Sequence, residues 1–141
     1  MDKKALIGLG VVALVCVAMF FILNKADESG AKYFGNEARG DLNGDGLEDK
    51  AYLVTRDNGG SGTFYYAVVE LKTADGYKKT NEFFIGDRIA PQNMYIPKNS
   101  QELQVNYAER KPGEPMTTRP SVGVTKLLKV TKDGVLEGLM K

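Results

Sequence analysis

A long apolar segment near the N-terminus divides the chain into two parts of different character. Residues 5–23 are nineteen consecutive uncharged and mostly apolar positions. As a helix they cover about 28 Å, close to the roughly 30 Å thickness of the hydrocarbon core of a bilayer. The apolar region of a secretory signal is usually shorter, about 7 to 15 residues. We therefore expect an N-terminal transmembrane anchor at residues 1–24 that contacts the membrane through residues 5–23.

The charges on either side of this segment predict its orientation. Lys3 and Lys4 precede it, whereas Lys25 on the other side is offset by Asp27 and Glu28. Basic flanking residues are retained in the cytoplasm. The chain is therefore expected to be a single-pass protein of the cytoplasmic membrane, with its N-terminus in the cytoplasm and its C-terminal domain outside.

Cleavage and lipidation are the alternatives to a retained anchor, and the sequence leaves only cleavage open. Small residues at positions 29–31 suit a signal peptidase, so that cleavage after Ala31 would release the domain. A lipid-accepting cysteine needs a small residue immediately before it, and Cys16 follows Val15 instead. We therefore interpret Cys16 as a small apolar side chain packed in the membrane.

Composition narrows the chemistry of the remaining chain. The whole chain has no histidine, and its only cysteine, Cys16, lies in the apolar segment. Nucleophile pairs that use histidine, histidine-ligated zinc and cysteine-based redox chemistry are therefore excluded. The formal net charge is +1, and acidic and basic residues are intermixed along the sequence. The sequence therefore does not predict the basic face of a nucleic-acid-binding protein. We expect a protein that is not an enzyme and has no nucleic-acid partner.

Strand patterns dominate the sequence after the apolar segment. Residues 25–39 are polar and show no period, so they are expected to form a tether. From residue 40 onward, runs of strand-forming residues alternate with turn sequences, and no amphipathic helix stands out. The expected strands include residues 50–56, 63–72, 77–85, 103–107, 122–131 and 135–139. The fold class is therefore mainly β, a single antiparallel β domain of five to seven strands at residues 40–141 behind one transmembrane helix.

An acidic loop at residues 41–49 has the pattern of a calcium site. Oxygen-bearing side chains recur at alternate positions, with Gly46 at the sixth position for a sharp turn. The expected ligands are the side chains of Asp41, Asn43, Asp45 and Asp49 and the backbone carbonyl of Leu47. The alternative is an Asx-rich turn that binds nothing. Four carboxylates without a base repel one another unless a cation is present, which favours calcium.

The position of the loop indicates a structural role for the ion. An EF-hand loop closes with a bidentate carboxylate at its twelfth position, where this chain has Tyr52. Helical calcium-binding families are therefore disfavoured, and we expect a weak site with a dissociation constant of about 10⁻⁴ to 10⁻³ M. Because the loop lies between the tether and the first expected strand, it is predicted to clip the domain where the chain enters it.

The loop resembles the calcium loops of FG-GAP and VCBS repeats in integrin-like and bacterial surface proteins. This resemblance covers residues 41–49 and implies the metal rather than a propeller, because those proteins carry many copies and this chain has one. Together, residues 40–49, 60–66, 86–89 and 107–116 resemble a group of small membrane- or lipid-anchored bacterial extracytoplasmic proteins of unknown function. That second resemblance implies an exported β domain and supplies no activity.

A second candidate site is formed by charged residues beside two expected loops, namely Asp87, Arg88, Glu109, Arg110 and Glu114. Asp87 or Glu109 could pair with Arg88 or Arg110 and pin the loops against the sheet, since arginine forks suit carboxylates. Alternatively, Arg88, Arg110 and Lys111 could hold an anionic ligand or contact a partner.

These features favour non-catalytic binding or assembly outside the membrane, with a protein partner of unknown identity. Two other classes remain open. A pilin-like filament subunit also joins an apolar N-terminal helix to a calcium-bearing β domain, although this chain lacks the processing glycine followed by Phe or Met. A hydrolase that works by carboxylates alone would need Asp87 and Glu109 to converge.

Overall fold

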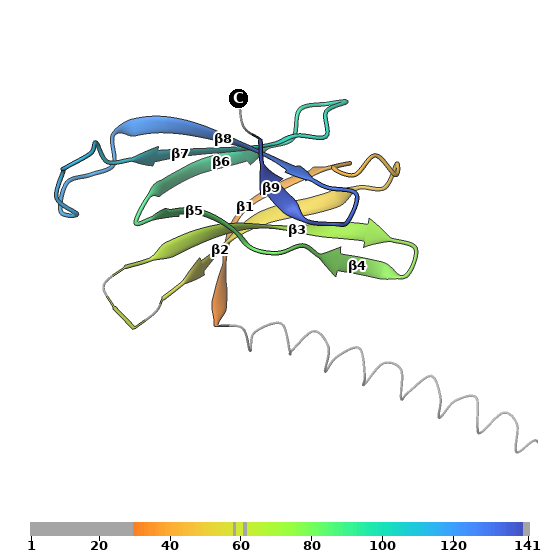
Figure 1. The fold of residues 1–141 in the computed structure, drawn as a ribbon, viewed down its shortest axis with the longest axis horizontal. Coiled ribbons are helices and arrows are strands. Elements are labelled where there is room, and N and C mark those ends of the chain that lie inside the picture. The colour runs from red at the N-terminus through yellow and green to blue at the C-terminus, as the bar shows by residue number, and fades with distance from the viewer. Residues whose placement is uncertain (1–29, 58, 61, 140–141) are drawn as a thin grey trace, which may run out of the picture. The chain divides into compact units, whose positions relative to one another are not determined.

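A computed structural model of the chain describes residues 30–57, 59–60 and 62–139. Over these residues the chain forms nine strands in two antiparallel sheets and no helix, which confirms the mainly β fold class (Figure 1). The expected transmembrane helix at residues 5–23 lies outside the described residues. Within the described residues, no helix has the length and apolar character needed to cross a membrane.

The two sheets are built from consecutive parts of the chain. The first contains β1 (Ala31–Gly40), β2 (Asp49–Arg56), β3 (Phe64–Thr73), β4 (Gly76–Lys79) and β5 (Phe83–Asp87). The second contains β6 (Ala90–Tyr95), β7 (Leu103–Glu109), β8 (Val122–Val130) and β9 (Leu136–Gly138), in that spatial order. Each expected hairpin is therefore present, with β2 on β3, β3 on β4, and β8 on β9.

Strand β3 is the centre of the first sheet. β2 pairs along one of its edges, and β4 and β5 share the other edge. The single return strand expected at residues 77–85 is therefore two strands, because residues 80–82 leave the regular ladder. Thr80 closes this gap: its backbone N–H donates to the carbonyl of Val69, and its Oγ1 accepts a hydrogen bond from the backbone N–H of Val69.

The core lies between the two sheets. Alternate residues of β7 point inward, so the predicted alternation of Leu103, Val105 and Tyr107 is confirmed by their near-complete burial. The inward side chains of both sheets form one buried cluster with Leu42 and Ile89 from two of the connections. Its members are Ala38, Leu42, Ala51, Leu53, Ala67, Val69, Leu71, Ile85, Ile89, Met94, Leu103, Val105, Tyr107, Leu128 and Leu136. The hydrophobic effect therefore holds the sheets face to face.

Two strands lie where the sequence predicts none. Residues 31–39, expected in the tether, form most of β1. Its alternation is interrupted by Gly35 and Asn36, whose positive φ angles of 123° and 55° produce an irregular strand without a readable period. β6 contains Pro91, a residue that strands accept mainly at sheet edges, and β6 is an edge strand. These two strands, with the division of the return strand, account for the excess over five to seven.

The connections between strands gather at two opposite ends of the sandwich (Figure 1). The acidic-loop end holds the connections at residues 41–48, 74–75, 96–102 and 131–135. The Arg110 end holds the connections at residues 88–89 and 110–121, together with the start of β1. Because β1 runs its whole length before the acidic loop begins, the loop lies at the end away from the chain's entry. Our expectation that it clips the entry of the domain was wrong.

Candidate metal centre

Asp41 shapes the first half of the acidic loop. Its Oδ1 accepts a hydrogen bond from the backbone N–H of Gly44, and its Oδ2 accepts one from Gly46, both at 2.8 Å. The two glycines have φ angles of 79° and 81°, a conformation that few other residues adopt without strain. Burial acts to raise the pKa of Asp41, but the bonds from Gly46 and Gly44 outweigh it and leave that pKa lowered.

In the exposed middle of the loop, side-chain oxygens accept hydrogen bonds from backbone N–H groups two residues further along the chain. Asn43 Oδ1 accepts from the backbone N–H of Asp45 at 3.4 Å, and Asp45 Oδ1 accepts from Leu47 at 2.9 Å. Asx side chains commonly bond the backbone two residues on in this way. The loop is therefore folded by its own side chains, with carboxylate oxygens gathered on its inner side.

Asp49 joins the loop to the sheet. It is fully buried, which is rare for a carboxylate. Its Oδ2 accepts a hydrogen bond from the backbone N–H of Leu42 at 2.8 Å. Its Oδ1 accepts one from the backbone N–H of Lys72, near the end of β3, also at 2.8 Å. Sequence reasoning identified Asp49 but missed Leu42 and Lys72, because a backbone N–H leaves no mark in the residue pattern.

The fold brings three of the predicted ligands together. One carboxylate oxygen from each of Asp41, Asp45 and Asp49 lies within 4.8 Å of the other two, close enough to hold a metal ion. Burial raises the pKa of Asp49, and the negative charges of Asp45 and Asp41 raise it further, against the two backbone hydrogen bonds. A cation would relieve this repulsion, so the group fits a metal. Ligand roles for Asn43 and Leu47 stay predictions.

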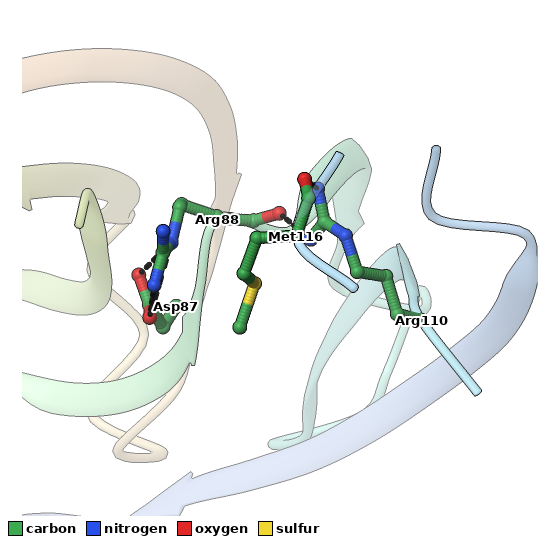
Figure 2. A network of polar contacts seen from close by, with 4 residues as sticks. All are labelled: Asp87, Arg88, Arg110 and Met116. Carbon is green, nitrogen blue, oxygen red and sulfur yellow. Dashed lines mark hydrogen bonds and ion pairs between the residues drawn. The ribbon is translucent and has the colours of Figure 1, made fainter. Parts of the chain in front are cut away.

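In the second candidate site, Arg88 and Arg110 bind other groups of the domain itself. Arg88 pairs with its neighbour Asp87, with 3.0 Å between Nη2 and Oδ2. Arg110 donates three hydrogen bonds to backbone carbonyls: Nε to Thr118 at 2.6 Å, Nη1 to Arg88 at 2.7 Å and Nη2 to Met116 at 3.0 Å. Figure 2 shows the guanidinium of Arg110 reaching the carbonyls of Arg88 and Met116. Arg110 thus joins the loop at residues 110–121 to the link between the sheets.

The remaining members of this group are spread over two sheets. Asp87 ends β5 in the first sheet and Glu109 ends β7 in the second. Glu114 Oε1 accepts a hydrogen bond from the backbone N–H of Lys111, whose side chain is exposed. An anionic ligand or a partner at Arg88, Arg110 and Lys111 stays a prediction.

Comparisons with known proteins give this chain no relative. No family model, no curated protein and no solved structure matches it. The structure therefore supports a small antiparallel β-sheet protein with an acidic group at Asp41, Asp45 and Asp49.

Proposed function

We propose that this chain is a membrane-anchored extracytoplasmic domain that serves non-catalytic binding or assembly and is stabilised by one calcium ion in the acidic loop. The observation that supports a bound metal ion is that one carboxylate oxygen from each of Asp41, Asp45 and Asp49 lies within 4.8 Å of the other two. The anchor rests on the apolar run at residues 5–23. The absence of histidine from the sequence favours a binding role over catalysis.

Calcium suits the donor set better than a transition metal. The candidate ligands are carboxylate, amide and carbonyl oxygens, and the loop offers neither a thiolate nor an imidazole. Oxygen ligands in a flexible loop favour calcium, whereas magnesium demands stricter octahedral geometry. Asn43 and Leu47 would supply the remaining protein ligands, with water completing the coordination.

The ion would act as a structural link. Asp49 already bonds the loop at Leu42 and the sheet at Lys72, so a cation bound to Asp49 would couple the exposed loop to β3. By neutralising carboxylates that repel one another, it would stabilise the folded state by linkage, in proportion to its occupancy. We expect a dissociation constant of about 10⁻⁴ to 10⁻³ M, typical of extracellular modules.

Calcium binding is tested by calorimetry. The full chain in detergent is first treated with chelator and is then titrated with calcium. We expect binding heat and a rise in melting temperature, both lost in Asp45→Asn. Asp45 is exposed, so this change leaves the core intact. Asp75→Asn alters another exposed carboxylate at the same end of the sandwich and should behave as wild type. Absence of calcium heat, together with an unchanged melting temperature in chelator, would exclude the metal.

Affinity purification of the full chain from its native membrane tests the binding or assembly role. We expect the same protein partner to be recovered with calcium and lost, or reduced, in chelator and in Asp45→Asn. Recovery of the chain alone under both conditions, by crosslinking as well as by purification, would contradict that role while leaving the calcium site unaffected.

A further inference from the structure

The Arg110 end is the part of the sandwich that follows the proposed anchor most closely along the chain. Seven residues, 24–30, separate the apolar run from the start of β1. Fully extended, they reach at most about 25 Å. The start of β1 belongs to the Arg110 end, while the acidic loop lies at the other end of the ten-residue strand β1. If residues 5–23 span the membrane, this connection is short enough for the Arg110 end to meet the lipid surface.

The exposed side chains at the Arg110 end have the chemistry of a lipid interface. Lys32 and Phe34 lie on the first residues of β1, and the Phe34 side chain is 44% exposed. The loop at residues 110–121 adds Lys111, Met116 and Arg119, all exposed, with Met116 at 49%. Apolar and aromatic side chains enter the headgroup region, and basic side chains extend along it to lipid phosphates.

The charge of the two ends differs in sign. The loop at residues 110–121 contains three basic residues and one acidic residue, whereas residues 41–49 contain four acidic residues and no basic one. Among the residues that the structure describes, no carboxylate forms an ion pair with Lys111 or Arg119. Their charges therefore remain available to an external anion, and an anionic bilayer attracts the Arg110 end and repels the acidic one.

The loop is held in a fixed form. Arg110 donates to the carbonyl of Thr118 within the loop. It also donates to the carbonyl of Met116 in the loop and to that of Arg88 on the link between the sheets (Figure 2). Met116 is thus presented by a backbone that is already ordered. Contact with a surface then requires little further loss of conformational entropy.

We infer that the Arg110 end rests on an anionic lipid surface, which it contacts through Lys32 and Phe34 on β1 and through Lys111, Met116 and Arg119 in the loop. This inference rests on the proposed anchoring.

Lipid quenching in proteoliposomes tests the contact. The full chain, with Cys16→Ala, carries a fluorophore at Met116→Cys in one sample and at Asp133→Cys in another. The vesicles contain phosphatidylglycerol and a lipid with a quencher near its headgroup. We expect loss of fluorescence at position 116 and none at 133, and weaker quenching at 116 in vesicles of phosphatidylcholine alone.

Charge reversal supplies the matched control. Lys111→Glu with Arg119→Glu should abolish the quenching at position 116. Lys98→Glu with Lys132→Glu, two exposed lysines at the acidic-loop end, should leave it unchanged. Equal melting temperatures would exclude an effect of unfolding.

The outcomes separate this inference from the proposed function. A chain that floats with the vesicles but is not quenched at position 116 is anchored and contradicts only the lipid contact. Quenching that is equal in both lipids, or unaffected by Lys111→Glu with Arg119→Glu, also overturns the anionic contact. A chain that fails to float with vesicles refutes the anchoring, and this inference with it.

Discussion

The carboxamide of Asn81 pairs with the backbone of Leu136 as a strand would. Its Nδ2 donates to the carbonyl of Leu136 at 3.1 Å, and its Oδ1 accepts from the Leu136 N–H at 2.8 Å. Asn81 lies in the gap between β4 and β5, whereas Leu136 begins β9 in the other sheet. One side chain therefore joins the two sheets at the point where the ladder of the first is interrupted.

Removing this side chain should loosen the sandwich. Asn81→Ala leaves the polar backbone of the buried Leu136 without these two partners, and we expect a loss of about 1–2 kcal/mol in the free energy of unfolding. Urea denaturation measures it. Asn106→Ala is the matched control, because Asn106 makes two exposed bonds within one sheet, to Asn93 and Thr125, and should cost less. Equal losses in the two variants would contradict a special role for Asn81.

The sequence predicts what depends on near neighbours along the chain. The acidic loop was found because its five candidate ligands lie within nine residues, and β7 was found because its apolar residues alternate. The bond from Lys72 to Asp49 joins residues 23 positions apart, and Asn81 and Leu136 are 55 apart. No local pattern records such pairs. β1 was missed for a different reason, since the positive φ angles of Gly35 and Asn36 erase the strand period.

Arg110 should stabilise the loop at residues 110–121. Arg110→Ala removes three hydrogen bonds from a charged donor to backbone carbonyls, and we expect a loss of about 1.5–3 kcal/mol in the free energy of unfolding. The loop should also be cleaved faster by proteinase K, a protease of broad specificity, whereas trypsin would not cut after Lys111 or Arg119 because each precedes a proline. Lys111→Ala, which changes an exposed neighbour, should alter neither stability nor the cleavage rate elsewhere in the loop. Unchanged stability in Arg110→Ala would show that the loop is held by other contacts.

Replacing Arg88 distinguishes a structural ion pair from a ligand contact at the Arg110 end. Its guanidinium forks onto Asp87, and both side chains are partly buried. Arg88→Ala should therefore lower the free energy of unfolding by about 1 kcal/mol, since the pair is partly exposed to solvent. Thermal unfolding measures this. A variant that keeps its stability but loses a partner in affinity purification would favour a ligand or partner contact instead.

Asp49 should matter for stability even without calcium. Asp49→Asn keeps the shape of the side chain but replaces one of two buried acceptors with a donor, which then faces the N–H of Leu42 or Lys72. We expect a loss of about 1–3 kcal/mol in chelator, from one unsatisfied buried donor. Asp45→Asn should cost much less in chelator, because Asp45 is exposed. If the two variants lose equal stability in chelator, Asp49 has no structural role beyond the metal.

Alkaline pH should destabilise the domain through Tyr52. Burial and the neighbouring Glu70, which accepts the hydrogen bond from the Tyr52 hydroxyl at 3.0 Å, raise the pKa of Tyr52. In the unfolded chain a tyrosine loses its proton near pH 10. Above that pH the unfolded state binds fewer protons than the folded state, so stability falls as pH rises. Burial raises the pKa of Tyr107 as well, and its contribution has the same sign.

Urea denaturation between about pH 9 and about pH 11, on either side of the ordinary tyrosine pKa, measures this loss. Tyr52→Phe has no proton to lose at this position, so its stability should fall less steeply with pH, although it begins from a lower value because the bond to Glu70 is gone. Tyr95→Phe is the matched control, since Tyr95 is 53% exposed, and its slope should equal that of the wild type. If the slope of Tyr52→Phe also equals that of the wild type, Tyr52 does not carry the alkaline transition, and Tyr107→Phe becomes the variant to measure.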